Sequence, residues 1–291
     1  MRKRPLRVLT LLARHGVEKY SAASEDLYDL YARQMPHVEH DILVIDNARP
    51  STWINTDSKG IRAIGGDNSS WEFSAWDRGI EYLGASLQKW DLIALVTSAF
   101  RQPHTAYLDR ISEPLLCCVA GRARALGHID YGGAPIELLG VRTQCWIRSS
   151  FLLVPPRELQ LLGRIASIPD GNYFFSGDAE NPFLQQAPLS LQYRKNIIAW
   201  LCGEGLGQGT TWHSRFDLTS KSLAFFEQKA RAILNEQRLS ARLVAQGCQL
   251  VDVTWLAAKL GAGNVPDILP SWRVQITSRD VDKGPETLLH L

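Results

Sequence analysis

The sequence predicts an α/β protein with a mostly parallel β-sheet flanked by helices. One observation predicts this class, and a second predicts where it binds a ligand. In the first half of the chain, short apolar runs typical of buried strands alternate with segments of helical periodicity. Each apolar run also ends in polar or glycine residues, and in such sheets ligands bind outside the carboxyl ends of the strands. We therefore expect a ligand site along one edge of the sheet.

The first expected strand covers residues 6–13. Residues 25–35 follow with apolar side chains at helical spacing, with Ser24 as the expected N-cap and acidic residues in the first turn. The other strands expected in this half are 42–45, 61–64 and 92–96, the last one after a further helix.

The rim of the expected active site is formed by the residues that follow these four strands. Because parallel strands end at the same edge, these residues should meet there. They are Arg14, His15, Gly16, Asp46, Asn47, Gly65, Gly66, Asp67, Asn68, Thr97 and Ser98.

The second half is less regular. Its longest helical pattern, residues 222–246, ends in Gly247, a residue suited to a helix C-terminus. The tail beyond residue 260 has little periodicity, so 261–291 is expected to be an extension that packs over the domain or a linker. We expect one domain over 1–260, with a nucleotide-binding part at about 1–130 and an acceptor part at about 131–260. The other expected elements are a strand at 145–154, a short helix ending near Gly163 and a helix through 197–201.

Composition limits the functional classes. The chain has 291 residues, 45% hydrophobic and 21% charged, which suits a globular protein with a sizeable core. The formal net charge of +2 gives no reason to expect nucleic acid as a partner. The basic start is followed by an apolar run too short for a signal peptide, and no run of 18 apolar residues occurs, so we expect a cytoplasmic protein.

The cysteines favour a reducing compartment. They are odd in number and show no C-x-x-C spacing, which argues against a disulfide framework and a zinc site. They are Cys117, Cys118, Cys145, Cys202 and Cys248.

The stretch "GGDNSSWEFSAWDRGI", residues 65–80, has two interpretations. Its glycines allow a ligand to approach the backbone closely, Asp67 or Asn68 can cap a helix starting near Ser69, and the helix N-terminus offers free N–H groups. The stretch would then form one wall of a nucleotide cleft. Alternatively it is an ordinary strand-to-helix turn, with Trp71 and Trp76 facing the core.

A second stretch carries a family resemblance. Residues 235–247, "NEQRLSARLVAQG", resemble the E-D-x-x-L-S-x-R-L-x-x-x-G segment of inverting family 2 glycosyltransferases with the GT-A fold. Glu236 stands where that family has the Asp of its E-D pair. In the same frame, the stretch at 65–80 resembles the family's N-x-G followed by R-N-x-G-I, with Asp77 at the second Asn. The similarity runs in order from about residue 6 to 247.

The resemblance implies a function and roles for residues. A GT-A-like, Rossmann-like sheet would bind a nucleotide-sugar donor, with Asp46 similar to the acid that contacts the base or ribose. Residues 145–159 are similar to the strand and turn before the acceptor site, which makes Trp146 and Arg148 acceptor-side candidates. The implied acceptor is a glycan or lipid-linked glycan in bacterial lipopolysaccharide, O-antigen or capsule synthesis. The implied setting is the inner membrane face, with peripheral membrane contact or contact with other polysaccharide-assembly proteins.

One departure from the family concerns metal binding. The family's D-x-D, which holds a divalent metal on the donor diphosphate, should follow the strand at 92–96, but Thr97-Ser98-Ala99 stands there. Hydroxyl groups without a carboxylate are poor Mg²⁺ or Mn²⁺ ligands, so we expect no metal and no other cofactor. Arginine suits bidentate phosphate contact. The candidates to neutralise the diphosphate are Arg101 and His104, and, after the next expected strand, Arg122 and Arg124.

Glu236 is the candidate general base. On a helix it shares a face with Ile233, Leu239 and Leu243, and positions 232 and 240 hold no basic residue. Burial on this apolar flank would raise its pKa towards the working pH, which suits general-base catalysis. The alternative is a boundary glutamate pointing to water.

The favoured hypothesis is an inverting transfer in which Glu236 deprotonates an acceptor hydroxyl that attacks the anomeric carbon of the donor. One alternative is a sugar-phosphate nucleotidyltransferase, although "ARHGVEKY" after the first strand lacks the glycine-rich segment that this class needs. Another is a non-catalytic GT-A-like module, which the missing D-x-D favours.

Overall fold

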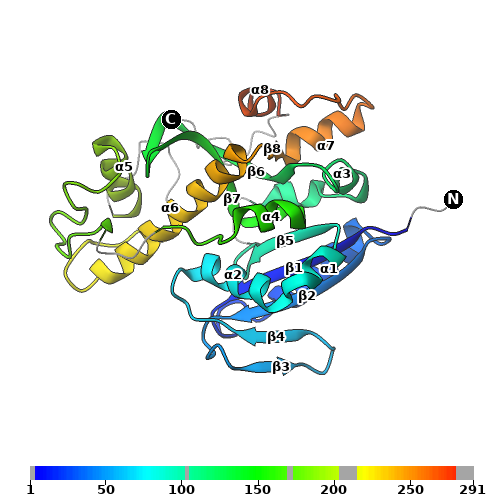
Figure 1. Cartoon of the computed structure of the whole chain (residues 1–291), viewed down its shortest axis with the longest axis horizontal. Coiled ribbons are helices and arrows are strands. Elements are labelled where there is room, and N and C mark those ends of the chain that lie inside the picture. Colours follow the sequence, from blue (N-terminus) through cyan, green and yellow to red (C-terminus); the bar gives the residue numbers. More distant parts are fainter. Residues whose placement is uncertain (1–3, 102–104, 169–172, 203–214, 280–291) are drawn as a thin grey trace. The chain divides into compact units, whose positions relative to one another are not determined.

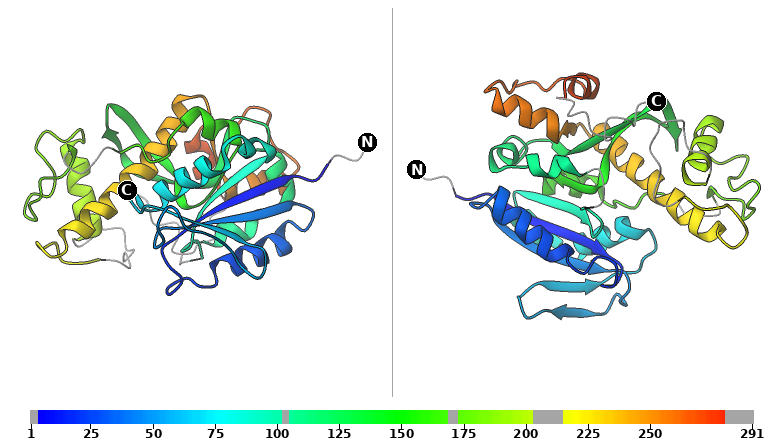
Figure 2. Two further views of the ribbon diagram at one scale, coloured as in Figure 1. Left: turned by 60° about the horizontal axis from the view of Figure 1, so that its bottom comes forward. Right: turned by 180° about the vertical axis from the view of Figure 1, so that it is seen from behind.

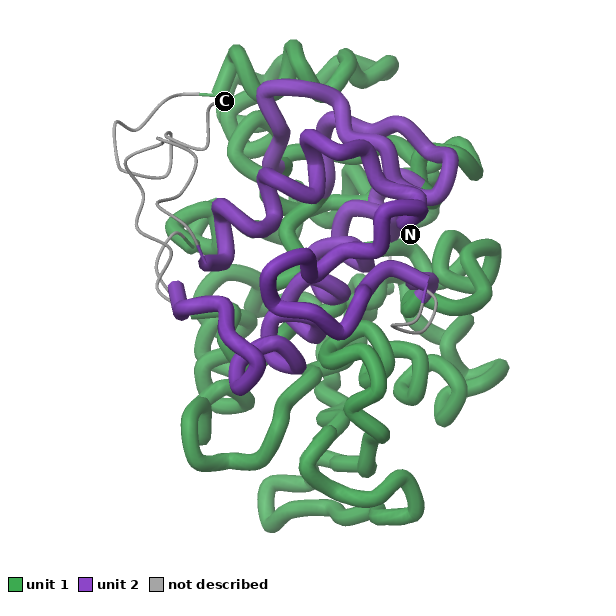
Figure 3. The backbone as a smooth tube through the Cα atoms, turned by 90° about the vertical axis from the view of Figure 1, so that its left-hand side faces the viewer, with its two compact units in different colours: residues 1–129, 147–166, 242–280 green, residues 130–146, 167–241, 281–291 purple. Residues whose placement is uncertain are grey.

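The computed structural model describes residues 4–101, 105–168, 173–202 and 215–279. The chain divides into two compact units, shown in two colours in Figure 3. Unit 1 comprises residues 1–129, 147–166 and 242–280, and unit 2 comprises 130–146, 167–241 and 281–291. The division into a nucleotide-binding part and an acceptor part stays a prediction.

The predicted α/β class is confirmed. Within the described residues, one eight-stranded, mostly parallel mixed sheet runs in the order β3-β4-β2-β1-β5-β7-β6-β8, with helices flanking it (Figure 1). The strands are β1 Arg7–Arg14, β2 Glu39–Asp46, β3 Ile54–Thr56, β4 Arg62–Gly65, β5 Leu92–Thr97, β6 Arg124–Leu138, β7 Val141–Val154 and β8 Gln249–Asp252.

The parallel strands β1, β2, β4 and β5 form the part of the sheet that the sequence predicted. Arg14 lies opposite Asp46, Asp46 opposite Gly65, and Ala13 opposite Thr97. All four carboxyl ends therefore meet at one edge. The chain adds β2 and β4 on one side of β1 and then returns to place β5 on the other side, which makes β1/β5 the topological switch point of the sheet.

Helices α1 (Ala23–Gln34) and α2 (Trp71–Leu83) cover opposite faces of these strands (Figure 2, left). On one face, Tyr31 of α1 is fully buried and its hydroxyl is 2.7 Å from the hydroxyl of Thr10 on β1. On the other, α2 packs so closely that a Cβ at Gly79 would lie 3.0 Å from Ile45. Successive side chains of each strand point to opposite faces, so the strands contribute to two apolar layers, one under α1 and one under α2.

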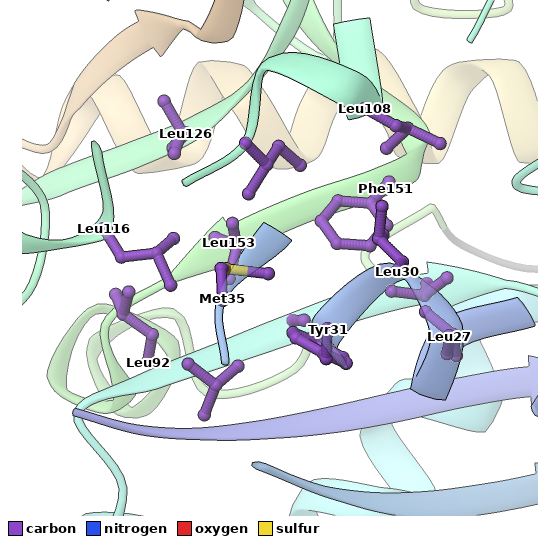
Figure 4. Close-up of a cluster of buried hydrophobic side chains, with 14 of the residues drawn as sticks. Leu27, Leu30, Tyr31, Met35, Leu92, Leu108, Leu116, Leu126, Phe151 and Leu153 are labelled. Atoms are coloured by element: carbon purple, nitrogen blue, oxygen red, sulfur yellow. The ribbon is translucent and has the colours of Figure 1, made fainter. Parts of the chain in front are cut away.

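A large apolar cluster under α1 forms the core of unit 1, and Figure 4 shows part of it. It combines Leu27, Leu30 and Tyr31 of α1 with strand residues such as Leu92 and Leu153. Removing such a buried leucine side chain costs about 2–5 kcal/mol. The other helical segments of this unit are η1 Gly84–Lys89, η2 Ala106–Arg110, α3 Glu113–Cys117, α4 Pro156–Leu162, α7 Val253–Gly261 and α8 Trp272–Thr277.

Three local predictions were wrong. Helix α1 begins one residue before Ser24, and its N-cap is Ala22 without a side-chain bond. Helix α2 begins at Trp71 rather than near Ser69, with Ser70 as N-cap. The segment before Arg122, expected to be a strand, is the short helix α3, because Pro114 at its start suits the first turn of a helix.

Strands β6 and β7 form a long hairpin that continues from unit 1 into unit 2. Its turn, Leu139-Gly140, has φ of 51° and 73°, the left-handed pair that a two-residue hairpin turn requires. The sequence analysis missed β6 because "GHIDYGGAP" interrupts the alternation expected of a strand.

Unit 2 has its own apolar cluster, built by α5 (Leu191–Leu201), the long helix α6 (Leu223–Ala245) and the loops near Phe174 and Phe183. Helix α6 matches its predicted range to within a residue at each end. No helix within the described residues is both long and apolar enough to cross a membrane.

The described part of the C-terminal segment packs on β8 in unit 1. Gln275, 1% exposed, accepts a bond from the N–H of Asp252 at 2.9 Å and donates to the carbonyl of Leu250 at 3.1 Å. Arg279 forms an ion pair of 3.1 Å with the buried carboxylate of Asp252. These polar contacts explain why helical periodicity did not reveal the docking of this segment.

Candidate functional site

A cavity of about 820 Å³ opens at the carboxyl edge of the sheet in unit 1. We call it the strand-end pocket. The predicted residues that line it are Arg14, His15, Gly16, Asp46 and Ser98, and the others are Val17, Glu18, Lys19, Tyr20, Ala48, Arg49, Trp53 and Asn55. Residues after β1 and Ser98 after β5 both line it, so the cavity lies at the switch point.

Asp46 is the buried polar centre of the pocket wall. It is 1% exposed, and its Oδ2 accepts a bond from the Arg14 Nε at 2.9 Å. Its Oδ1 accepts from the backbone N–H groups of Gly16 at 2.9 Å and Ala48 at 3.0 Å. The carboxylate therefore ties the loop after β1 to the loop after β2.

The ionisation of Asp46 follows from these contacts. Burial raises the pKa of its carboxyl, but the two N–H bonds and the Arg14 guanidinium outweigh burial and hold the pKa below its ordinary value. Asp46 is therefore a carboxylate near neutral pH, with both oxygens already engaged by the chain.

The basic side chains of the pocket differ in whether they form an ion pair with a carboxylate. The Arg14 charge is offset by Asp46, whereas Arg49 and Lys19 are exposed and form no ion pair with a described carboxylate. The Arg49 guanidinium lies 5.5 Å from the ring centre of Trp53, and the Lys19 ammonium 5.3 Å from that of Tyr20. The pocket thus combines aromatic surfaces with cations available to an anionic ligand.

The two glycines of the "GGDN" loop allow close packing against another part of the same chain. A Cβ at Gly65 would lie 1.8 Å from the carbonyl oxygen of Pro50, and one at Gly66 would lie 2.0 Å from the Asn47 Oδ1. The backbone of these glycines is therefore closely approached, but by the turn after β2. Among the described residues that line the strand-end pocket, none comes from 65–68.

Asn47 holds the same loop from the other side. Its Nδ2 donates to the carbonyl of Trp71 at 2.8 Å and to the Asn68 Oδ1 at 3.2 Å. Asn68 and Trp71 have φ of 54° and 52°, a conformation that Asn tolerates better than Trp does. Asp67 is exposed and accepts from the N–H of Ser69 at 2.9 Å. Burial raises the pKa of Asp67, but the bonds from Ser69 and Ser74 and the charge of Arg164 lower it further than that.

Asp77 is placed away from the strand-end pocket. Its carboxylate oxygens accept the backbone N–H groups of Ile165 at 2.5 Å and Ala166 at 3.0 Å, so it fixes the segment after α4. Burial raises the pKa of its carboxyl, and the two N–H bonds only partly oppose this. Asp77 therefore has a structural contact, and its predicted contact with the donor stays a prediction.

The structure places Thr97, a predicted nucleotide-sugar contact, and the diphosphate-neutralising candidates as follows. Thr97 does not line the pocket, and Arg101 is engaged on α1, where it donates to the carbonyl of Asp26 at 3.2 Å. His104 lies outside the described residues. Arg122 and Arg124 lie at the amino end of β6, which is parallel to β5 in the sheet, so they are at the opposite edge. The structure therefore places these two arginines away from the expected rim at the carboxyl edge.

Glu236 belongs to unit 2, where it is half-buried on α6. Its sequence neighbours fix the rotation of the helix: the Asn235 Oδ1 accepts the N–H groups of Ser167 and Ile168, and Gln237 accepts a bond from the Tyr193 hydroxyl. Burial, and then the charge of Glu236, raise the pKa of Tyr193 well above its ordinary value. The buried Tyr193 phenol is therefore neutral near pH 7, and the charge of Glu236 contributes to this.

The acceptor-side candidates lie on β7. Trp146 is 8% exposed and belongs to unit 2, whereas Arg148 is half-buried in unit 1. Their proposed roles stay predictions.

No group of three or more His, Cys, Asp or Glu side chains suited to a metal ion occurs in the described part of the chain. All five cysteines are free thiols. The expected independence from metal is left to a chelation experiment.

No protein-family model matches the chain, and no curated protein matches it either.

Sequence reasoning missed the part of the wall formed by residues 17–20 and by Arg49, Trp53 and Asn55. It skipped the segment between β2 and β4 because β3 has only three residues, all exposed. One signal was present: Arg49 and Trp53 stand in the connection that follows Asp46, and an aromatic ring can stack on a base beside a cation that contacts a phosphate.

Proposed function

We propose that this protein is a nucleotide-sugar-dependent glycosyltransferase of the GT-A-like type, with the nucleotide in the strand-end pocket. One observation carries the proposal: the cavity lies at the β1/β5 switch point of a mostly parallel sheet, where nucleotide ligands of such sheets bind. The resemblance of residues 235–247 and 65–80 to inverting family 2 glycosyltransferases supports the choice of reaction.

The chemistry of the pocket wall fits a nucleoside diphosphate. Trp53 offers a flat apolar face to a base, and Arg49 and Lys19 offer cationic donors to a diphosphate. Asp46 positions the loops that carry these groups. Such preorganised cations can stabilise a leaving diphosphate by several kcal/mol without a metal.

In the proposed reaction Glu236 removes the proton from an acceptor sugar hydroxyl. The resulting oxygen attacks the anomeric carbon of the donor, the bond to the nucleoside diphosphate breaks, and the configuration inverts in one displacement. The acceptor we propose is a glycan or lipid-linked glycan, as in bacterial surface polysaccharide synthesis.

The decisive experiment incubates the purified chain with a panel of nucleotide sugars and measures release of the free nucleotide. We expect slow hydrolysis of one donor, weakened by Arg49→Gln and unaffected by Arg62→Gln, an exposed arginine away from the pocket. Absence of binding and hydrolysis across the whole panel would count against the proposal.

A non-catalytic GT-A-like module is the second candidate, and Thr97-Ser98-Ala99 in place of D-x-D favours it. A chain that binds one nucleotide sugar in the strand-end pocket but never hydrolyses or transfers it would be of this kind.

A further inference from the structure

A second cavity, of about 450 Å³, lies at the amino edge of the sheet in unit 1. We call it the amino-edge pocket. Its lining residues are Arg122, Ala123, Arg124, Gly247, Gln249 and Asp267. Arg124 and Gln249 are paired across β6 and β8, so the pocket is built on adjoining strands.

Arg124 is an unusual buried cation. It is 7% exposed, and its guanidinium donates to two backbone carbonyls, those of Cys118 at 2.8 Å and Asp267 at 3.2 Å. In the described structure it forms no ion pair with a carboxylate. A buried charge normally has a charged partner, because desolvation is costly.

The neighbouring groups increase this imbalance. Burial lowers the pKa of Arg124, and the charge of Arg122 lowers it further, while Asp267 opposes the shift. Arg122 is exposed and forms no ion pair with a described residue. The pocket therefore carries two guanidinium groups against one exposed carboxylate.

We propose that the amino-edge pocket binds a phosphate group, with Arg122, Arg124 and the Gln249 amide as its ligands. Arginine provides paired N–H donors that match phosphate oxygens, and a bound anion would offset the charge of the buried Arg124. This site is separate from the strand-end pocket, because the two share no lining residue and lie at opposite edges of the sheet.

The phosphate could come from a soluble compound or from a lipid headgroup. Ile268, next to Asp267, is 83% exposed and would face the surface of a bilayer if the source were a lipid. The chemistry recognised in the pocket is the same in both cases.

The test is calorimetric titration of the full chain with inorganic phosphate at constant ionic strength, set by chloride. Arg122→Gln, at an exposed position, should weaken phosphate binding about tenfold, the scale of one lost charge-assisted contact. Asp267→Asn should tighten it several-fold, because it removes the opposing carboxylate. Arg62→Gln, the same charge change at a distant exposed position, should leave it unchanged.

Two controls separate this site from the strand-end pocket and from misfolding. The titrations are repeated in an Arg49→Gln background, in which the component sensitive to Arg122 should persist. Arg124→Lys keeps the charge but loses the paired donors, so it should weaken binding while thermal unfolding stays cooperative. Equal binding in wild type, Arg122→Gln and Asp267→Asn, or no binding beyond chloride, would overturn the proposal.

The source is identified by co-flotation with vesicles. If the phosphate belongs to a lipid, wild type should float with phosphatidylglycerol vesicles and not with phosphatidylcholine vesicles, and Arg122→Gln should float less. If it is soluble, phosphate titration succeeds and neither type of vesicle retains the chain.

Discussion

The Arg14 guanidinium and the Asp46 carboxylate join the ends of β1 and β2, with Nε 2.9 Å from Oδ2. The same carboxylate accepts the N–H groups of Gly16 and Ala48. One buried acid thus fixes two loops that line the strand-end pocket. Asp46 was predicted to contact the nucleotide, and that contact stays a prediction. The structure shows that Asp46 holds the two loops in position.

Asp46→Asn should lower the free energy of unfolding at pH 7 by about 1–3 kcal/mol, because a buried, hydrogen-bonded ion pair is broken. The pKa of Asp46 is below its ordinary value in the folded chain, so its contribution is full above the unfolded pKa of about 3.9 and is lost as the pH falls through the folded pKa. Urea unfolding from pH 7 to pH 2.5 should therefore bring wild type and variant together at the acid end.

Asp109→Asn is the control for this experiment. Asp109 forms a surface ion pair with Arg33, 3.3 Å long and with both side chains more than half exposed. Such a pair contributes about 0–1 kcal/mol, so the control should stay near wild type. A difference between wild type and Asp46→Asn that does not change with pH would mean that the charge of Asp46 is not the cause.

Gly65→Ala should destabilise the chain by about 1–3 kcal/mol, the usual cost of overpacking, because the new Cβ meets the Pro50 carbonyl. Gly261→Ala is the matched control: a Cβ there meets nothing within 4 Å, and the residue lies at the end of α7. Thermal unfolding should place the first variant below wild type and the second at or above it. Equal melting temperatures would show that the turn after β2 shifts to accept the added Cβ at little cost in stability.

These residues also show which parts of the fold and the site could be predicted from the sequence. Short apolar runs predicted β1, β2, β4 and β5, and helical periodicity predicted α6, because both patterns are local signals. These local patterns could not predict that Gly65 packs against the Pro50 carbonyl or that Asp77 binds the backbone after α4. Those partners are set by the tertiary fold. Strand ends located Asp46 and Ser98 in the pocket, but Trp53 and Arg49 came from a connection without periodicity.

Trp53→Ala should weaken nucleotide binding by about 1–3 kcal/mol, the scale of one base–aromatic contact. Asp46→Ala should weaken donor binding by a similar ~1–3 kcal/mol, because the loops that it fixes would lose their positions. Calorimetric titration with the best nucleotide from the donor panel measures both. Trp90→Ala, at a ring that contacts Arg7, is the control and should bind normally. Unchanged affinity in Trp53→Ala would exclude stacking on this ring.

Glu236→Gln should keep the fold and nucleotide binding while lowering turnover by at least about a hundredfold, the scale of lost general-base catalysis. Glu227→Gln, on the same helix, should retain turnover. Initial rates and binding are measured on the same preparations. Near-normal turnover in Glu236→Gln would remove this residue from the mechanism.

Activity should survive chelation. The position where the resembling family anchors its metal holds Thr97-Ser98-Ala99, whose hydroxyl and methyl groups bring no negative charge to offset the desolvation of a divalent ion. The cations of the strand-end pocket would stabilise the leaving diphosphate instead, so Arg49→Gln should lower turnover steeply while EDTA leaves the wild-type rate unchanged. If EDTA abolishes turnover and Mn²⁺ or Mg²⁺ restores it, carboxylates elsewhere hold a metal. Asp67, exposed at the end of β4, would then be the first ligand to test, by asking whether Asp67→Asn prevents the rescue.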